Sequence, residues 1–322
     1  MSFEKEVNEL KDIISKYHSF FLTLHINPDA DSCGSMLSFY YYLKNIGKNV
    51  YLYSHDKIQD NLKILPFVKD IKNTIDNNKF FDVGIFFECS TLDRAGDEIK
   101  DLSFKKIISI DHHKTADRYG DLNIYDFESS STAEIMYDIY QNLGANIDKT
   151  IAILLYSGIV TDTNKFHYSQ TKPKTHIIAA HLISTGIDFK AINDNFFMKT
   201  RYENIKLLGR AIEGMNIYDN SISVMCLLKK DFEEFKALPS DSENIINYPM
   251  MIENVKVSIL IREDDEKYTT TFRSKDSIDV SKVAILFGGG GHKNACGFKI
   301  SKTKINLNSL IEKVVDEVRK IL

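Results

Sequence analysis

Residues that can bind a divalent cation gather in one short string of the sequence. The string HINPDADSCGS contains His25, Asp29 and Asp31, and it follows the apolar run at 20–26. A neutral imidazole and two carboxylates on one loop can chelate hard or borderline divalent cations. Both aspartates are also common turn and helix-capping residues. The string alone therefore leaves a metal site and a capped helix about equally open.

A second polar group follows a different apolar run. Asp111, His112 and His113 stand together at the end of KIISID, residues 106–111. A helix cap beside two surface histidines is the alternative, because a tripeptide by itself is weak support for a site. Its weight comes from its position after a second strand of what we predict to be the same sheet.

Two further carboxylates occupy similar positions. Glu88 ends the run DVGIFFE, and Asp162 lies in GIVTDTNKF. Arg94 follows six residues after Glu88, and its charge suits an anion. The alternatives are a strand-end glutamate, a surface arginine and an aspartate at a helix end. For Glu88 taken alone, that alternative is the better interpretation.

A run of glycines points to an anion. Consecutive glycines let backbone N–H groups approach a phosphate closely, because no Cβ stands in the way. His292 adds a side-chain donor, and Arg273 and Ser274 upstream suit the same anion. Ordering such a run costs much entropy, which favours a functional reason over a flexible loop. The glycines are Gly288, Gly289, Gly290 and Gly291.

The elements that must position these residues alternate in the first half of the chain. Apolar runs at 20–26, 50–54, 82–88 and 106–111 predict strands, and helical periodicity separates them, as in residues 35–45. This alternation predicts a parallel sheet with helices on both faces. Ligands of such a sheet bind at the carboxyl ends of the strands, where the polar groups stand.

The rest of the chain divides into a helical and a mixed region. Residues 131–214 are predicted to be mostly helical, with a Ser131/Glu134 capping box. The run at 150–162 fits a buried helix and a buried strand equally well. We therefore predict an α/β protein with a metal-binding domain at 1–187, a helical linker at 188–216 and a smaller α+β domain at 217–322.

Composition excludes several classes of protein. The 322 residues, 43% of them hydrophobic, suit a soluble chain of about two domains. We expect no membrane span and no secretion signal, and we interpret the four cysteines as reduced thiols in a cytoplasm. The net charge of −4 argues against long duplex DNA as a ligand, but it is compatible with a small anion in a local pocket.

Taken in order, these motifs resemble those of the DHH phosphoesterase family with its DHH-associated C-terminal domain. Length and layout are most similar to the branch of nanoRNases and pAp phosphatases. The resemblance spans residues ~20–300, and the matching strings are HINPDADSCGS, ECSTLDRAG, IDHHKT, GIVTDTNKF and GGGGHKNACGF.

The resemblance implies a site with two metal ions, usually manganese, with Mg²⁺ or Co²⁺ as substitutes. One ion would be held by His25 and Asp29, the other by Asp31, His112 and Asp162, and Glu88 would bridge both. His113, beside Asp111, would touch the scissile phosphate or the leaving group. The glycine run, His292, Arg273 and Ser274 would bind the terminal phosphate or nucleotide, and Arg94 would cover an anion.

One position departs from the family pattern, because Glu88 stands where the family normally has aspartate. The extra methylene moves the carboxylate outward by roughly 1.5 Å. We expect activity to be retained, since the other five ligand positions are intact. The alternative is a nucleotide sensor whose metal pair Glu88 has disabled.

The activity implied by the resemblance is hydrolysis of short RNA oligonucleotides and linear dinucleotides such as pApA or pGpG. Dephosphorylation of pAp is a second activity of the same site. A RecJ-like exonuclease is a weaker alternative, because that type carries an additional nucleic-acid-binding domain. Family likeness also suggests a homodimer.

Overall fold

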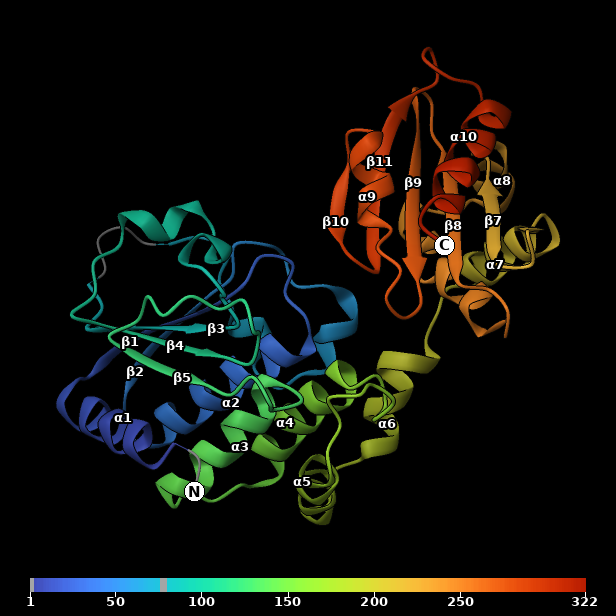
Figure 1. The fold of residues 1–322 in the computed structure, drawn as a ribbon. Coiled ribbons are helices and arrows are strands. Elements are labelled where there is room, and N and C mark those ends of the chain that lie inside the picture. Colours follow the sequence, from blue (N-terminus) through green and yellow to red (C-terminus); the bar gives the residue numbers. More distant parts are fainter. Residues whose placement is uncertain (1–2, 76–79) are drawn as a thin grey trace. The chain divides into compact units, whose positions relative to one another are not determined.

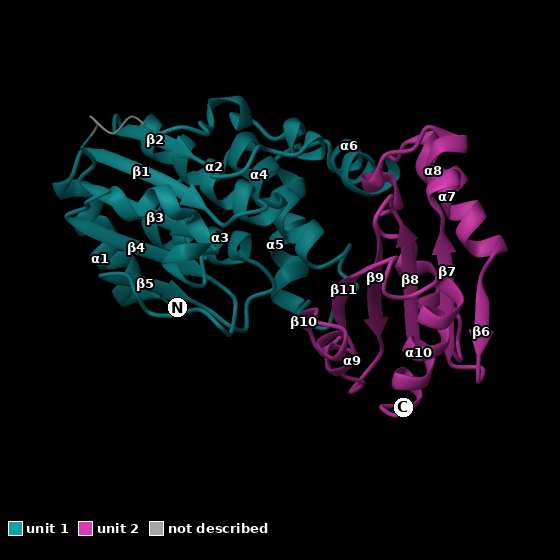
Figure 2. Cartoon of the chain, turned by 90° about the horizontal axis from the view of Figure 1, so that it is seen from above, with its two compact units in different colours: residues 1–199 teal, residues 200–322 magenta. Residues whose placement is uncertain are grey.

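The computed structural model describes residues 3–75 and 80–322. It forms two compact units, unit 1 at Met1–Lys199 and unit 2 at Thr200–Leu322 (Figure 2). No helix among the described residues combines the length and hydrophobicity that crossing a bilayer requires.

Unit 1 is built on a parallel sheet of five strands in the order β2-β1-β3-β4-β5 (Figure 1). The four predicted strands are confirmed, and β5 is an additional short strand that pairs with β4. The strands are β1 Ser19–Leu24, β2 Asn49–Tyr53, β3 Val83–Phe87, β4 Lys106–Asp111 and β5 Leu122–Tyr125.

The two faces of this sheet are covered differently. The helices α1 to α5 share one large apolar core with alternate residues of the strands. The other face packs against a smaller core that includes Ala95 and Ile99, which belong to the 3₁₀ turns Leu92–Ala95 and Asp97–Asp101. The helices of unit 1 are α1 Glu4–Lys16, α2 Ala30–Asn45, α3 Thr132–Leu143, α4 Lys149–Asp162, α5 Pro173–Ser184 and α6 Phe189–Asn193.

Local capping explains where three of these helices begin. α2 starts five residues before the predicted range, because Asp29 and Ser32 form a capping box around its first turn. The run at 150–162 is helical in α4, whose first amides bind the Asp148 carboxylate. The capping box predicted for α3 is only half formed: Ser131 accepts from the Glu134 amide, but the Glu134 carboxylate binds Ser130 instead.

Unit 2 contains a mixed sheet in the order β10-β11-β9-β8-β7-β6, in which only β7 and β8 are parallel (Figure 2). α9 and α10 pack on one face, and α7 packs on β7 on the other. The strands are β6 Asn216–Tyr218, β7 Ile222–Leu227, β8 Val257–Glu263, β9 Lys267–Ser274, β10 Gly290–His292 and β11 Ala295–Ser301. The helices are α7 Tyr202–Glu213, α8 Lys229–Phe235, α9 Ser281–Leu286 and α10 Leu307–Arg319.

The segment 188–216, predicted as a linker, is divided between the units. α6 and a π-helical turn at Asp194–Met198 belong to unit 1. α7 belongs to unit 2, because its residues Leu207 and Ala211 are buried against Met225 of β7.

Candidate metal centre

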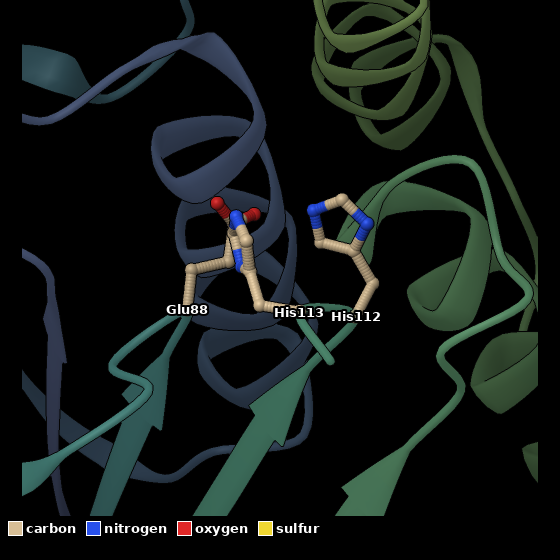
Figure 3. A group of neighbouring side chains, drawn as sticks. All are labelled: Glu88, His112 and His113. Atoms are coloured by element: carbon tan, nitrogen blue, oxygen red, sulfur yellow. The ribbon is translucent and has the colours of Figure 1, made fainter. Parts of the chain in front are cut away.

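The candidate ligands lie at the carboxyl edge of the parallel sheet of unit 1. His25 follows β1, Glu88 follows β3, and His112 follows β4. These three strands are neighbours in register, with Leu24 opposite Phe87 and Phe87 opposite Ile110. The register therefore brings the three polar residues together directly after the last paired positions, as Figure 3 shows for Glu88 and His112.

His25, Asp29 and Glu88 form the first group of possible ligands. The Nε2 atom of His25 lies 3.5 Å from Asp29 Oδ2 and 3.6 Å from Glu88 Oε2. Its Nδ1 atom lies 2.7 Å from the Ile26 carbonyl, and a bond there leaves Nε2 without a proton and able to bind a cation. Asp29 uses Oδ1 to cap α2 through Ser32, so the cap and the metal-facing oxygen belong to the same carboxylate.

Asp31, His112 and Asp162 form the second group. The buried Asp31 carboxylate accepts from the amides of Thr132 and Ala133, at 2.7 and 2.8 Å, where α3 begins. The Nε2 atom of His112 lies 3.5 Å from Asp162 Oδ2. One ligand atom from each of these three acidic or imidazole side chains lies within 4.8 Å of the others.

Glu88 connects the two groups. It forms a third possible metal-binding set with His112 and His113, besides the one with His25 and Asp29 (Figure 3). Its backbone is left-handed, with φ of +56°, at the point where the chain leaves β3. Burial, then the nearby charges of Asp31 and Asp29, hold the pKa of Glu88 well above its usual value.

The chemistry of this cluster fits a divalent cation. Glu88 Oε1, His112 Nε2 and Asp162 Oδ2 are buried and have no hydrogen-bond partner among the described residues. Burial, followed by the charges of Asp31 and Asp29, raises the pKa of Asp162 to about 8. Burial also lowers the pKa of His112, which keeps its ring neutral. A cation would supply the missing partner of all three atoms and would offset the crowded negative charge.

Three further pKa shifts, in the cluster and beside it, result from opposing effects. Burial raises the pKa of Asp29, but the nearby His25 ring and the hydrogen bonds from Ser32 outweigh it and lower the value to about 2. For His25, burial acts to lower the pKa, and the contacts with Asp29 and the Ile26 carbonyl raise it overall. The hydrogen bond to Asp111 raises the pKa of His113.

His113 is held in one orientation beside the cluster. Its Nδ1 atom and its backbone amide each lie 2.8 Å from the same oxygen of Asp111, a fully buried residue. The imidazole itself is half exposed. A histidine oriented by a buried carboxylate is suited to proton transfer or to contact with an anion.

Arg94 lies at the same edge of unit 1. Its carbonyl accepts from the Ile26 amide at 2.7 Å, and its guanidinium is near enough to His25 to act on the pKa of that ring. The Arg94 side chain is exposed and makes no ion pair among the described residues.

The other predicted phosphate-binding residues lie in unit 2. His292 and Arg273 are both paired with Ala295, from β10 and β9 on either side of β11, so they share one face of the sheet. Ser274 is engaged within its own turn: its hydroxyl donates to the Ile278 carbonyl and accepts from Asn294.

The four glycines have different structural roles. A Cβ on Gly289 would stand 2.2 Å from the Gly297 carbonyl, so close packing excludes any side chain there. Gly288 and Gly291 have φ of +77° and +134°. Gly290 has neither constraint, since its φ is not positive and no described atom lies within 4 Å of the position of its Cβ.

Sequence reasoning assigned Glu134 to a cap and missed its role in support of the cluster. The buried carboxylate of Glu134 accepts from Ser130 at 2.6 Å and from Thr175 at 2.9 Å. These bonds anchor the start of α3, whose amides hold Asp31. The available signal was the unusual string SSSTAE, which places four consecutive hydroxyl side chains at the predicted start of the helix.

Comparison with known proteins identifies two domains in this chain. The sequence matches the model of the DHH family, N-terminal domain, over residues 19–159, and that of the DHHA1 domain over residues 221–320. A bifunctional oligoribonuclease and PAP phosphatase NrnA from Thermus thermophilus is 26% identical, with 94% of this chain and 90% of that protein covered. The protein of the same name from Bacillus subtilis is also 26% identical, with 91% and 92% covered.

A solved structure has the same fold over nearly the whole length. An exopolyphosphatase-related protein from Bacteroides fragilis has a TM-score of 0.86 and 26% sequence identity, and the match covers 98% of this chain and 95% of that one. The relatives support the assignment of this protein as a hydrolase of a metal-dependent family. Since the two domain models together cover about three quarters of its length, the chain belongs to the DHH family and carries a DHHA1 domain after its DHH domain.

Proposed function

We propose that this protein is a phosphoesterase that hydrolyses short RNA oligonucleotides and linear dinucleotides to mononucleotides, and that also converts pAp to AMP and phosphate. The observation that carries the proposal is the cluster around Glu88, in which three buried ligand atoms have no partner among the described residues. The named activity of the NrnA relatives supports the substrate class.

Two divalent cations, Mn²⁺ in the first place and Mg²⁺ or Co²⁺ as substitutes, suit the two groups of ligands. His25 and Asp29 would hold one, and Asp31, His112 and Asp162 the other, with Glu88 shared between them. Cations in such sites neutralise phosphate charge and make water a better nucleophile near neutral pH.

The chain's own residues supply the proton and the grip on substrate. Asp111 accepts a hydrogen bond from His113 Nδ1 and so holds the imidazole with Nε2 available. The protonated Nε2 gives its proton to the leaving oxygen as the phosphorus–oxygen bond breaks. In unit 2, Arg273, His292 and the glycine run would bind a phosphate that is not hydrolysed, since guanidinium and backbone amides suit that anion.

Incubation with pApA and Mn²⁺, followed by chromatography of the products, tests the proposal. AMP is the expected product. Tight nucleotide binding without turnover in any divalent metal would instead identify a sensor disabled at Glu88. Degradation of long single-stranded DNA at a rate similar to that of pApA would favour a RecJ-like exonuclease.

The role of His113 has its own test. His113→Ala is expected to lose rate on pApA but to retain most of its rate on an aryl phosphate ester, because an acidic leaving group departs without a proton donor. Equal losses on both substrates would exclude His113 as the general acid.

A further inference from the structure

One face of the unit 2 sheet is half-exposed over β9 and β11 and carries positive charge beyond the predicted phosphate-binding residues. The register places Arg262 of β8, Thr269 of β9 and Lys299 of β11 in one row across the sheet. Arg273 lies on the same face of β9, four residues from Thr269, which corresponds to roughly 13 Å along a strand. None of these four residues is buried.

The row of residues between these two positions carries few side-chain atoms. Thr271 of β9 faces Gly297 of β11 there, so β11 contributes no side chain at the centre of the face. The opposite face of the same strands is filled by the core residues Phe272 and Phe298 under α9 and α10.

Ion pairing separates the arginines of unit 2, all of which lie in its fully described residues 200–322, into two classes. Arg201, Arg210 and Arg319 each make ion pairs with two carboxylates. Arg262 and Arg273 have no carboxylate within ion-pairing distance. The two unpaired guanidinium groups are therefore the two that share this half-exposed face.

The same two arginines also line one pocket. This pocket, of about 270 Å³, is bounded by Arg262, Arg273, Thr271 and the chain around Glu243. Glu243 makes no ion pair with either arginine among the described residues. A second pocket, of about 340 Å³, lies on the other side of Arg262 and is lined by Thr269 and Lys299. Arg262 thus stands between two adjoining hollows.

The acidic residues in the second pocket are already engaged. Glu263 pairs with Lys302, Asp265 pairs with Lys229, and the Asp264 carboxylate accepts from the Lys267 amide. Lys299 makes no ion pair among the described residues.

The Arg262 guanidinium is oriented without being saturated. Its Nη1 atom donates to Ser242 Oγ at 2.9 Å, and it lies 3.4 Å from the Pro239 carbonyl, both in the 3₁₀ turn that follows α8. No described residue accepts from its Nη2 atom. An arginine fixed at one nitrogen and free at the other loses less side-chain entropy when it binds a phosphate.

We propose that Arg262, together with Lys299, forms a second phosphate subsite beside Arg273, so that unit 2 binds two phosphates of one single-stranded oligonucleotide. The inference rests on the proposed function and concerns its preference for substrate length. Both pAp and pApA carry one phosphate besides the one that is hydrolysed, whereas pApApA carries two. The second subsite therefore favours trinucleotides and longer substrates over pAp.

The test compares hydrolysis of pAp, pApA and pApApA by the full chain at several salt concentrations, with affinities for each measured separately. Arg262→Gln is expected to raise the ratio of KM for pApApA to KM for pAp by about tenfold, the typical effect of one charge-assisted contact. The salt dependence of log KM for pApApA should fall by about 0.7, the value for one contact with single-stranded phosphate. Lys299→Gln should change both quantities in the same direction by less.

Two control variants distinguish a subsite from a structural effect. Lys313→Gln removes the same charge from an exposed position on α10, over the opposite face, and should leave the ratio unchanged. Ser242→Ala removes the hydroxyl that accepts from Arg262. If Ser242→Ala and Arg262→Gln both raise KM by the same factor for pAp, pApA and pApApA, Arg262 acts by holding the turn and the inference is wrong.

The remaining outcomes are also decisive. An unchanged ratio in both Arg262→Gln and Lys299→Gln would overturn the subsite even if the wild type hydrolyses every substrate, and the proposed function would stand. If Arg262→Gln does not fold, Lys299→Gln decides alone. If the wild type hydrolyses none of the substrates, the proposed function fails, and the relative affinities for pApApA and pAp still test the subsite.

Discussion

Removal of divalent cations is expected to make the protein less stable as pH rises, and Asp162→Asn should reverse much of that loss. Burial and the nearby carboxylates Asp31 and Asp29 raise the pKa of Asp162 from 3.8 to about 8. Between these values the folded chain holds a proton that the unfolded chain has released. Stability therefore falls with rising pH across this window, by at most about 1.4 kcal/mol per pH unit for one group.

The size of the effect follows from that slope. Between pH 5.5 and 7.5 the metal-free protein should lose up to about 3 kcal/mol from Asp162, with a further loss from Glu88, whose pKa is raised for the same reasons. For a domain of this size, 1 kcal/mol corresponds to roughly 2–4 °C in Tm. The expected decrease in Tm is therefore on the order of 5–10 °C.

Thermal unfolding followed by circular dichroism, with a chelator or with Mn²⁺, measures this decrease. Mn²⁺ should raise Tm far more at pH 7.5 than at pH 5.5. Without metal, Asp162→Asn should exceed the wild type in Tm at pH 7.5 but not at pH 5.5, although it should be inactive. Asp12→Asn, on the exposed side of α1, is the matched control and should follow the wild type. A metal-free wild type whose Tm rises over this range would refute the reasoning.

Three other predictions follow from single contacts. Asp31→Ala should lower the unfolding free energy by about 2–4 kcal/mol, because two buried amides at the start of α3 lose their acceptor. Asp29→Ala removes one helix cap and should lower it by about 1 kcal/mol. Urea unfolding compares the two variants, and equal losses would contradict these assignments. Glu88→Asp should keep activity, and Glu88→Gln should lose at least about a hundredfold in hydrolysis rate, since the shared ligand must carry charge. Plasma mass spectrometry measures the metal content of each variant alongside the rates. An active Glu88→Gln would show that Glu88 is not a ligand. Gly289→Ala should destabilise unit 2 by more than about 2 kcal/mol, because its Cβ would overlap the backbone of β11. Gly290→Ala should leave Tm unchanged and weaken substrate binding. A stable Gly289→Ala would argue against the close packing of Gly289 on β11.

Local patterns were sufficient to predict most elements and the positions of the polar groups. Apolar runs five to seven residues long marked the strands, and each polar group was expected where a run ended. The same patterns could not decide the run at 150–162, which is apolar on every side and became the buried helix α4. They also missed β5, a strand of four residues, because so short a run carries little periodicity.

The candidate ligands come from positions as far apart as His25 and Asp162, and their convergence could be predicted only by combining two arguments. The carboxyl ends of adjacent parallel strands meet at one edge, which applies to His25, Glu88 and His112. Asp162 ends a helix, so only the family resemblance assigned it to the same site. The structure places its carboxylate 3.5 Å from His112.

The sequence by itself therefore determined the types of the reactive residues and the elements that carry them, because periodicity and capping act over a few neighbouring residues. The tertiary structure alone decided what each side chain faces. It joined Asp31 to the amides of α3 a hundred residues away, engaged Ser274 within its own turn, and set Arg262 on the same sheet face as Arg273 through the register of β8 and β9. These contacts depend on strand register and on packing between distant segments, and no local pattern encodes either of them.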